Sequence, residues 1–132
     1  MSEKIFGSTL PFIAHCGIRP LERGQGRARL TVRLEPHHLN NSGVGHGGLV
    51  MTLLDVSMAS AAGSATGTNV VTVDMQTAFL APATGVLTSE AKVVRAGKSI
   101  VFVEGQITND RGDLVAKATC VCKAVKGQAG DG

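Results

Sequence analysis

Residues 40–48, NNSGVGHGG, place two amide side chains, a histidine and two adjacent glycines directly before a long apolar segment. Gly47 and Gly48 each disfavour a helix start by roughly 1 kcal/mol relative to alanine, so something must require their bare backbone. Unpaired N–H groups at a helix start, at the positive end of the macrodipole, can form a site for an anion or an oxyanion. Close packing of the helix against the loop explains the glycines equally well.

One carboxylate, Asp55, lies within the apolar segment. On a helix it falls in the third turn, beyond the capping positions. Its helical neighbours are apolar: Met51, Leu54, Met58 and Ala59. A carboxylate in such surroundings is costly unless it has a partner. Asp55 is therefore either a structural residue bonded to Thr52, Ser57 or a strand residue, or a general base or nucleophile.

The spacing of these groups constrains any shared chemistry. Gly47 and Asp55 are eight residues apart, which is about 12 Å along a regular helix. One carbonyl carbon cannot contact both from a single chain. If both act on one substrate, the oxyanion donors come from one subunit and Asp55 from another. The spacing then predicts two shared sites in a dimer whose helices lie side by side.

Other polar residues near this stretch indicate a functional role less specifically. His46 more often caps a helix or fixes a loop than acts as a general base, and both roles remain open. Asn40 or Asn41 could orient a carbonyl or a water through its amide. His37 and His38 follow a proline and are expected to face solvent. The spacing of the four histidines fits no metal-ligand pattern, so we expect neither a metal ion nor a cofactor.

Hydrophobic periodicity predicts the elements that hold these residues. Residues 46–64 are apolar on every side of a helical axis, which indicates a buried helix, and Gly63 and Gly67 bracket its end. Ahead of it the patterns predict, in order, a short helical arm within 3–15, a short strand over 16–22 and a half-buried strand over 27–35. After it they predict strands over 69–80, 86–95, 99–108 and 114–125.

These elements define an α+β architecture in which antiparallel strands must wrap the one long helix, because nothing else can bury it. Short turns make the last three strands an antiparallel meander. The final strand carries small residues on one face, which lets the helix approach closely: Ala116, Ala118, Cys120, Cys122 and Ala124. One sheet edge stays uncovered, and we expect a dimer that continues the sheet.

The composition indicates one globular domain, expected over residues 1–126, with a disordered tail at 127–132. A net charge of +3 without a basic cluster, and no Trp or Tyr, argue against a nucleic-acid partner. Cys16, Cys120 and Cys122 fit no zinc or redox pattern and predict reduced thiols in a cytoplasmic protein. No apolar run reaches the roughly 20 residues of a membrane span, so no membrane association is expected.

Asn40, Gly43, His46, Gly47 and Gly48 form the pattern NxxGxxHGG, and Asp55 follows nine residues after the histidine. With FLAP (79–82), RAGKS (95–99) and NDRGDLVAKA (109–118), this pattern resembles the hotdog-fold acyl-CoA thioesterases, especially the phenylacetate-pathway type. The resemblance covers roughly residues 12–125. It implies a central helix wrapped by a five- to six-stranded antiparallel sheet, a homodimer commonly paired into a tetramer, and hydrolysis of an acyl-CoA substrate.

By position, the resemblance implies that the Gly47 N–H and Asn40 polarise the thioester carbonyl. Asp55 of the partner chain would activate water or attack directly, while His46 would hold the loop or assist. Thr72 stands where such enzymes keep a Ser or Thr that positions the water.

The resemblance also implies substrate contacts at Gly48 and at the turn formed by Arg95, Gly97, Lys98 and Ser99, near the CoA phosphates or the pantetheine arm. The acyl group is expected beside the N-terminal arm, at Phe6, Phe12 and Ile13, and beside the helix around Met58 and Ser60.

Alternatives to hydrolysis remain. Hotdog hydratases place an Asp and a His close together on the helix approach, and no such pair occurs here, which disfavours hydration of an enoyl-CoA. A non-catalytic acyl-CoA binding module would hold the same ligand without cleaving it. In a third alternative the helix and Asp55 serve only dimer assembly.

Overall fold

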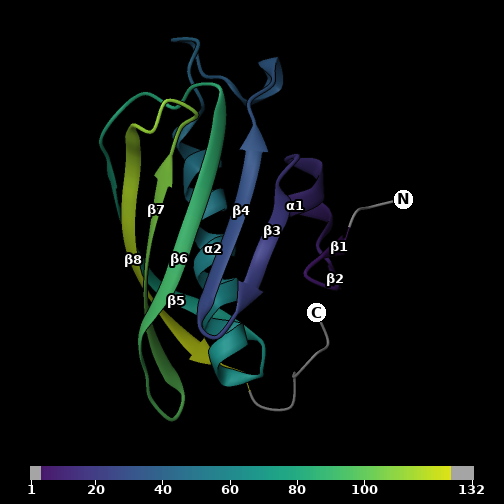
Figure 1. Ribbon diagram of the computed structural model, residues 1–132, viewed down its shortest axis with the longest axis vertical. Coiled ribbons are helices and arrows are strands. Elements are labelled where there is room, and N and C mark those ends of the chain that lie inside the picture. Colours follow the sequence, from purple (N-terminus) through teal and green to yellow (C-terminus); the bar gives the residue numbers. More distant parts are fainter. Residues whose placement is uncertain (1–3, 126–132) are drawn as a thin grey trace.

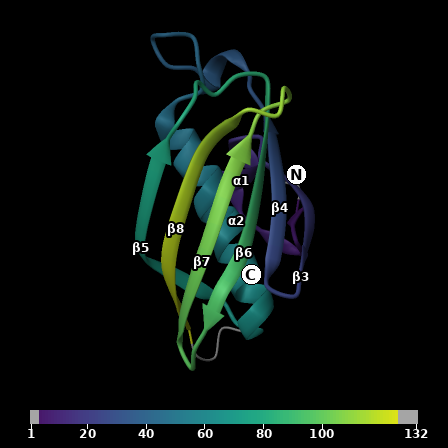
Figure 2. The same cartoon turned by 60° about the vertical axis from the view of Figure 1, so that its left-hand side comes forward.

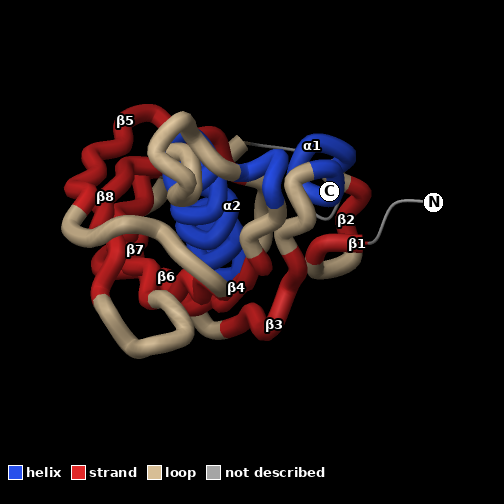
Figure 3. Tube along the Cα trace, turned by 90° about the horizontal axis from the view of Figure 1, so that it is seen from above, coloured by secondary structure: helices blue, strands red, loops and turns tan. Residues whose placement is uncertain are grey.

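One long helix, α2 (Gly47–Thr66), lies against a six-stranded antiparallel sheet in the computed structural model, which describes residues 4–125 (Figure 1). Seen from above, the sheet curves around the helix (Figure 3). The predicted α+β architecture is therefore confirmed, and α2 differs from the predicted helix by one residue at its start and two at its end. Gly67 ends it in the left-handed conformation, with φ of 74°. The predicted tail at 127–132 lies outside the described residues.

The sheet order is β3-β4-β6-β7-β8-β5. β5, the first strand after the helix in the chain, therefore forms one edge of the sheet. Its strands are β3 (Arg19–Gly24), β4 (Arg27–Arg33), β5 (Val70–Phe79), β6 (Val86–Ala96), β7 (Ile100–Thr108) and β8 (Leu114–Ala124). The predicted meander is present as β6-β7-β8. The helix crosses from β4 on one side of the sheet to β5 at the opposite edge (Figure 2).

The N-terminal part differs from the prediction of a single helical arm. Residues 4–9 form a hairpin of β1 (Lys4–Ile5) and β2 (Ser8–Thr9), and only α1 (Pro11–His15) is helical. The hairpin forms because Phe6 and Gly7 take φ of 52° and 85°, as a two-residue hairpin turn requires. The predicted strand over 16–22 is displaced to β3, since Gly17 first turns the chain with φ of 77°.

The core lies between α2 and the sheet. Leu53, Leu54 and Met58 of α2 are fully buried, and the small-residue face of β8 is buried beneath the helix from Ala116 to Cys122, as predicted. α2 is long and apolar enough, with a mean hydropathy of 1.3, to cross a membrane by length and composition alone, contrary to our expectation of no such segment. Its burial in the fold accounts for this composition.

One side of α2 and the adjoining edge of the sheet remain uncovered in the single chain. Met51 is 38% exposed, and Asp55 and Ala59, spaced four residues apart along the same side, are half-buried. β5 is the sheet edge at this side, and its Val73 and Phe79 are 60% and 55% exposed. The helix is thus not buried all round, because the sheet covers only part of its circumference.

Close approach of helix and sheet gives a first prediction. A Cβ added at Gly105 of β7 would lie 3.1 Å from Cγ of Met58, so Gly105→Val should lower the free energy of unfolding by about 1–3 kcal/mol through overpacking. The neighbouring Glu104→Val on the exposed face loses only a surface ion pair to Lys92 and should change it by less than about 1 kcal/mol. Urea denaturation measures both, and equal effects would contradict the packing account.

Candidate active site

Asp55 has a defined partner on the sheet. Oγ1 of Thr72 in β5 donates to Oδ1 of Asp55 at 2.6 Å. Thr72 reaches the helix because β5 has a bulge at Val73: Thr72 pairs with the buried Cys122, whereas Asp74 pairs with Val121. The bulge turns Thr72 toward α2 and Asp74 away from it. The structure therefore brings together two predicted site residues that are 17 positions apart.

Two buried thiols lie behind this pair. Sγ of Cys120 and Sγ of Cys122 are 3.5 Å apart on the face of β8 that packs against α2. The hydrogen bond with Cys122 raises the pKa of the Cys120 thiol, and burial and the nearby Asp55 charge act in the same direction. Cys120 therefore stays a neutral thiol at physiological pH. The same hydrogen bond lowers the pKa of the Cys122 thiol, against the opposing effects of burial and the Asp55 charge.

His46 is the N-cap residue of α2. Its Nδ1 accepts a hydrogen bond from the Gly48 N–H at 2.9 Å, which fixes the ring against the first turn. The Gly47 N–H has no acceptor among residues 4–125. A Cβ at Gly47 would make only ordinary contact, at 3.5 Å, with the Phe79 ring. Packing within the chain thus does not explain the glycine at position 47.

Asn40 shapes the loop before the helix. Its Oδ1 accepts from the Ser42 N–H at 2.8 Å and the Val44 N–H at 3.3 Å, and its own N–H donates to the Val44 carbonyl. Because the loop occupies Oδ1, the side-chain NH₂ is the part left to donate to a ligand, and it has no acceptor within the described part of the chain.

The structure separates other predicted site residues. The Ser99 carbonyl accepts a hydrogen bond from the Ala124 N–H. Ala124 in turn pairs with Val70, which follows shortly after the end of α2. The turn with Arg95, Gly97, Lys98 and Ser99 therefore lies at the end of the fold opposite Gly47 (Figure 1). Within one chain it does not join Asn40, Gly47 and Gly48, and its role in CoA binding stays a prediction.

The expectation that His38 faces solvent is wrong. The side chain is buried, with its Nδ1 accepting from the Glu35 N–H and its Nε2 2.6 Å from the Cys16 carbonyl. This places the proton on Nε2 and ties the loop at Pro36–His38 to the chain after α1. His38 is a structural residue that pattern reading missed, because its acceptor lies 22 positions away in sequence.

A groove of about 880 Å³ runs along α2 beyond Asp55. Phe6 and Ser60, both expected near the acyl group, line it. Phe12 and Ile13 do not, and Met58 instead lies in the core against Gly105. Arg23 also lines the groove, although no sequence pattern pointed to this residue.

Solved structures with this architecture are hotdog-fold proteins that include thioesterases. The PaaI protein of the phenylacetic acid degradation operon of E. coli matches with a TM-score of 0.87 and 25% identity, over 91% of this chain and 88% of its own. A conserved protein of Pseudomonas aeruginosa matches with a TM-score of 0.86 and 25% identity, over 91% of this chain and 98% of its own. A Streptococcus mutans protein solved with acetyl-CoA bound matches with a TM-score of 0.79 and 25% identity, over 85% of this chain and 90% of its own.

Residues 42–116, more than half of the sequence, match the model of the thioesterase superfamily, and the chain belongs to that family. Two archaeal proteins that carry the name "putative esterase" are also similar. The one from Halobacterium salinarum is 33% identical over 102 residues, covering 70% of this chain and 66% of its own length. The one from Saccharolobus solfataricus is 29% identical over 118 residues, covering 88% and 84%. The activity that fold and family support is hydrolysis of acyl thioesters.

The geometry of His46 predicts a capping role that can be measured. His46→Ala removes the acceptor for the Gly48 N–H and should lower the free energy of unfolding by about 1 kcal/mol. His46→Asn supplies another capping acceptor and should restore it. Urea denaturation and thioester hydrolysis are followed together. Restored stability without restored activity would show that His46 also takes part in the reaction.

Proposed function

We propose that the protein hydrolyses acyl-CoA thioesters with an aryl or medium-chain acyl group, in sites shared by the two subunits of a homodimer. The observation that carries the proposal is the pairing of Asp55 with the Thr72 hydroxyl on the uncovered side of α2. Membership of the thioesterase superfamily supports thioester cleavage. The acetyl-CoA-bound S. mutans relative supports CoA as the thiol, and the likeness to E. coli PaaI supports an aryl acyl group.

Asp55 supplies the base or the nucleophile. The Thr72 hydroxyl has a single proton and donates it to Oδ1 of Asp55. Oδ2 is then the oxygen that accepts a proton from the attacking water or itself attacks the thioester carbon. The C–S bond breaks and CoA leaves as the free thiol with a proton from the water. In the base route the water oxygen becomes part of the free acid directly. In the nucleophile route water then hydrolyses the anhydride between the acyl group and Asp55, which releases the acid and restores the carboxylate.

The opposite end of α2 supplies the oxyanion donors. The Gly47 N–H at the start of the helix and the side-chain NH₂ of Asn40 both lack an acceptor within residues 4–125. Two such donors stabilise the negative oxygen that forms when a thioester carbonyl is attacked. Gly48 cannot serve in the same way in this arrangement, because its N–H is bonded to His46.

A dimer brings the two ends together. Gly47 and Asp55 are separated by about 12 Å along one helix, whereas two α2 helices antiparallel across a two-fold axis place Gly47 of one beside Asp55 of the other. The same interface covers the exposed β5 edge with Val73 and Phe79. It also carries the partner's turn at 95–99 toward the Gly47 end, where Arg95 and Lys98 would meet the CoA phosphates. Pairing of two dimers into a tetramer completes the proposal.

Substitution of the carboxylate tests the function directly. Asp55→Asn keeps an oxygen for the Thr72 hydroxyl but removes the charge, so kcat should fall about 10²- to 10⁴-fold. Thiol release from a panel of aryl and medium-chain acyl-CoA thioesters measures the rate. Asp74→Asn, an exposed position on the same strand, is the matched control and should leave it unchanged.

Near-normal turnover by Asp55→Asn would refute the role of Asp55. Acyl-CoA binding by the wild-type protein without any thiol release would instead indicate a binding module. A loss of stability or of dimer formation in Asp55→Asn, with no activity in the wild type, would indicate a role in assembly.

Position 47 allows the N–H to be removed with little structural change. Gly47 is the first residue of α2, where proline is well tolerated, and His46 already has φ of −61° and ψ of 139°, as a residue before proline prefers. Gly47→Pro should lower kcat about 10²- to 10³-fold through loss of an oxyanion donor. Gly47→Ala keeps the N–H and is the control. Similar rates for the two variants would contradict the oxyanion role.

The same variants test the shared site. In a mixed dimer of Gly47→Pro and Asp55→Asn, one site contains both changes and the other contains neither. After subunit exchange in an equal mixture, about a quarter of wild-type activity should return. No recovery after proven exchange would place Gly47 and Asp55 in separate sites.

A further inference from the structure

The groove along α2 begins at Val56, the residue after Asp55, and has a floor and two sides. Ala59, Ser60 and Gly63 of α2 form its floor, residues of the N-terminal hairpin such as Ile5 and Phe6 form one side, and the first residues of β5 form the other. The lining mixes apolar side chains with hydroxyl and amide side chains, those of Ser8, Ser60, Ser64, Thr68 and Asn69. Among the described residues that line the groove, Arg23 from β3 is the only charged one.

Arg23 is held in place by the helix. Its Nε donates to the carbonyl oxygen of Ser60 at 2.8 Å. Its guanidinium lies over Gly63, where an added Cβ would come within 2.7 Å of Nη2. Glycine is disfavoured in the interior of a helix. Its presence at position 63 makes room both for this guanidinium and for the Thr68 carbonyl oxygen, which would lie 3.2 Å from an added Cβ. Sequence positions 23 and 63 are thus matched to fix one cation at the groove.

The rest of the guanidinium has no protein partner. Nη1 and Nη2 of Arg23 contact no carboxylate and no other acceptor within residues 4–125, unlike Arg29, which is paired with Glu22 and Glu90. A guanidinium presents its N–H groups as a planar fork that matches the two oxygens of a carboxylate. The groove therefore combines an apolar wall with an unused, oriented site for an anionic group.

We propose that this groove receives the acyl group and that Arg23 selects acyl groups carrying a carboxylate at the end distant from the thioester. The inference rests on the proposed function, in which the thioester carbon lies next to the Asp55 carboxylate. Ser60 and Gly63 lie five and eight residues beyond Asp55, about 7.5 and 12 Å along the helix axis. An acyl chain of medium length that starts at Asp55 and follows the groove ends at the Arg23 guanidinium.

Matched substrate pairs test this selection. Thiol release is measured for linear acyl-CoA thioesters and for their counterparts of equal chain length with a terminal carboxylate, and kcat/KM is compared within each pair. The wild-type protein should prefer the carboxylated member at medium length. Arg23→Gln should lower that preference about ten- to a hundredfold, because a charge-assisted bond is lost. Arg23→Lys should lower it less, since the charge remains without the fork.

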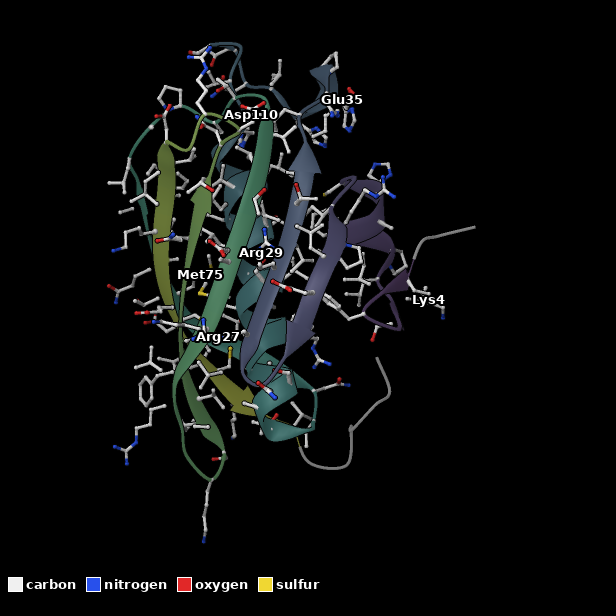
Figure 4. The ribbon with its side chains drawn as sticks, in the orientation of Figure 1. Lys4, Arg27, Arg29, Glu35, Met75 and Asp110 are labelled. Atoms are coloured by element: carbon white, nitrogen blue, oxygen red, sulfur yellow. The ribbon has the colours of Figure 1, made fainter. Side chains whose placement is uncertain are left out.

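Arg27→Gln is the matched control. Arg27 lies on β4 with its side chain on the outer face of the sheet, away from the groove (Figure 4), and its substitution should leave the preference unchanged. Thiol release from neither member of any pair would refute the proposed function itself. Release without a preference for the carboxylated member, or an equal loss on both members in Arg23→Gln, would overturn only the present inference. Equal loss would indicate that Arg23 supports the fold or the site as a whole and does not contact the terminal carboxylate.

Discussion

The partial burial of α2 is the constraint on which the rest of the structure depends. A helix that is apolar on nearly every side has to be covered, but a curved sheet on one side of it reaches only part of its circumference. Leu53, Leu54 and Met58 face the sheet, whereas Met51, Asp55 and Ala59 remain along the open side next to the β5 edge. The acid thus lies within the apolar surface that a second subunit would cover. In the proposed dimer, assembly and completion of the site are the same event.

Asp55 has defined polar surroundings on the open side of α2. The carboxylate is half-buried and accepts a hydrogen bond from the Thr72 hydroxyl. Its neighbour Cys120 remains a neutral thiol, because hydrogen bonding with Cys122, burial and the Asp55 charge all raise its pKa. The bulge at Val73 is what makes this arrangement possible, since an unbroken alternation would put Thr72 and Asp74 on the same face.

Elements with a long, regular pattern were predictable from the sequence. The helix and the strands from β4 to β8 follow from periods of 3.6 and 2 residues and from turn residues between them. The pattern around Gly47 and Asp55 predicted the candidate site. Features that depend on distant pairs were not predictable. The bond between His38 and Cys16 and the fit of Arg23 over Gly63 each join positions without a shared local pattern. The hairpin at Phe6 and Gly7 is local, but it requires a positive φ at Phe6, a conformation that a phenylalanine does not signal.

The two glycines at the helix start, which the sequence could not separate, have different causes in the structure. A Cβ at Gly48 would lie 3.2 Å from Nδ1 of His46, the acceptor of its own N–H, so close packing of the cap explains that glycine. A Cβ at Gly47 would make only ordinary contact with the Phe79 ring, and its N–H is left without an acceptor among the described residues. Because alanine would fit there, packing within residues 4–125 does not account for this glycine. Close packing therefore accounts for Gly48, whereas the oxyanion role of Gly47 stays a proposal.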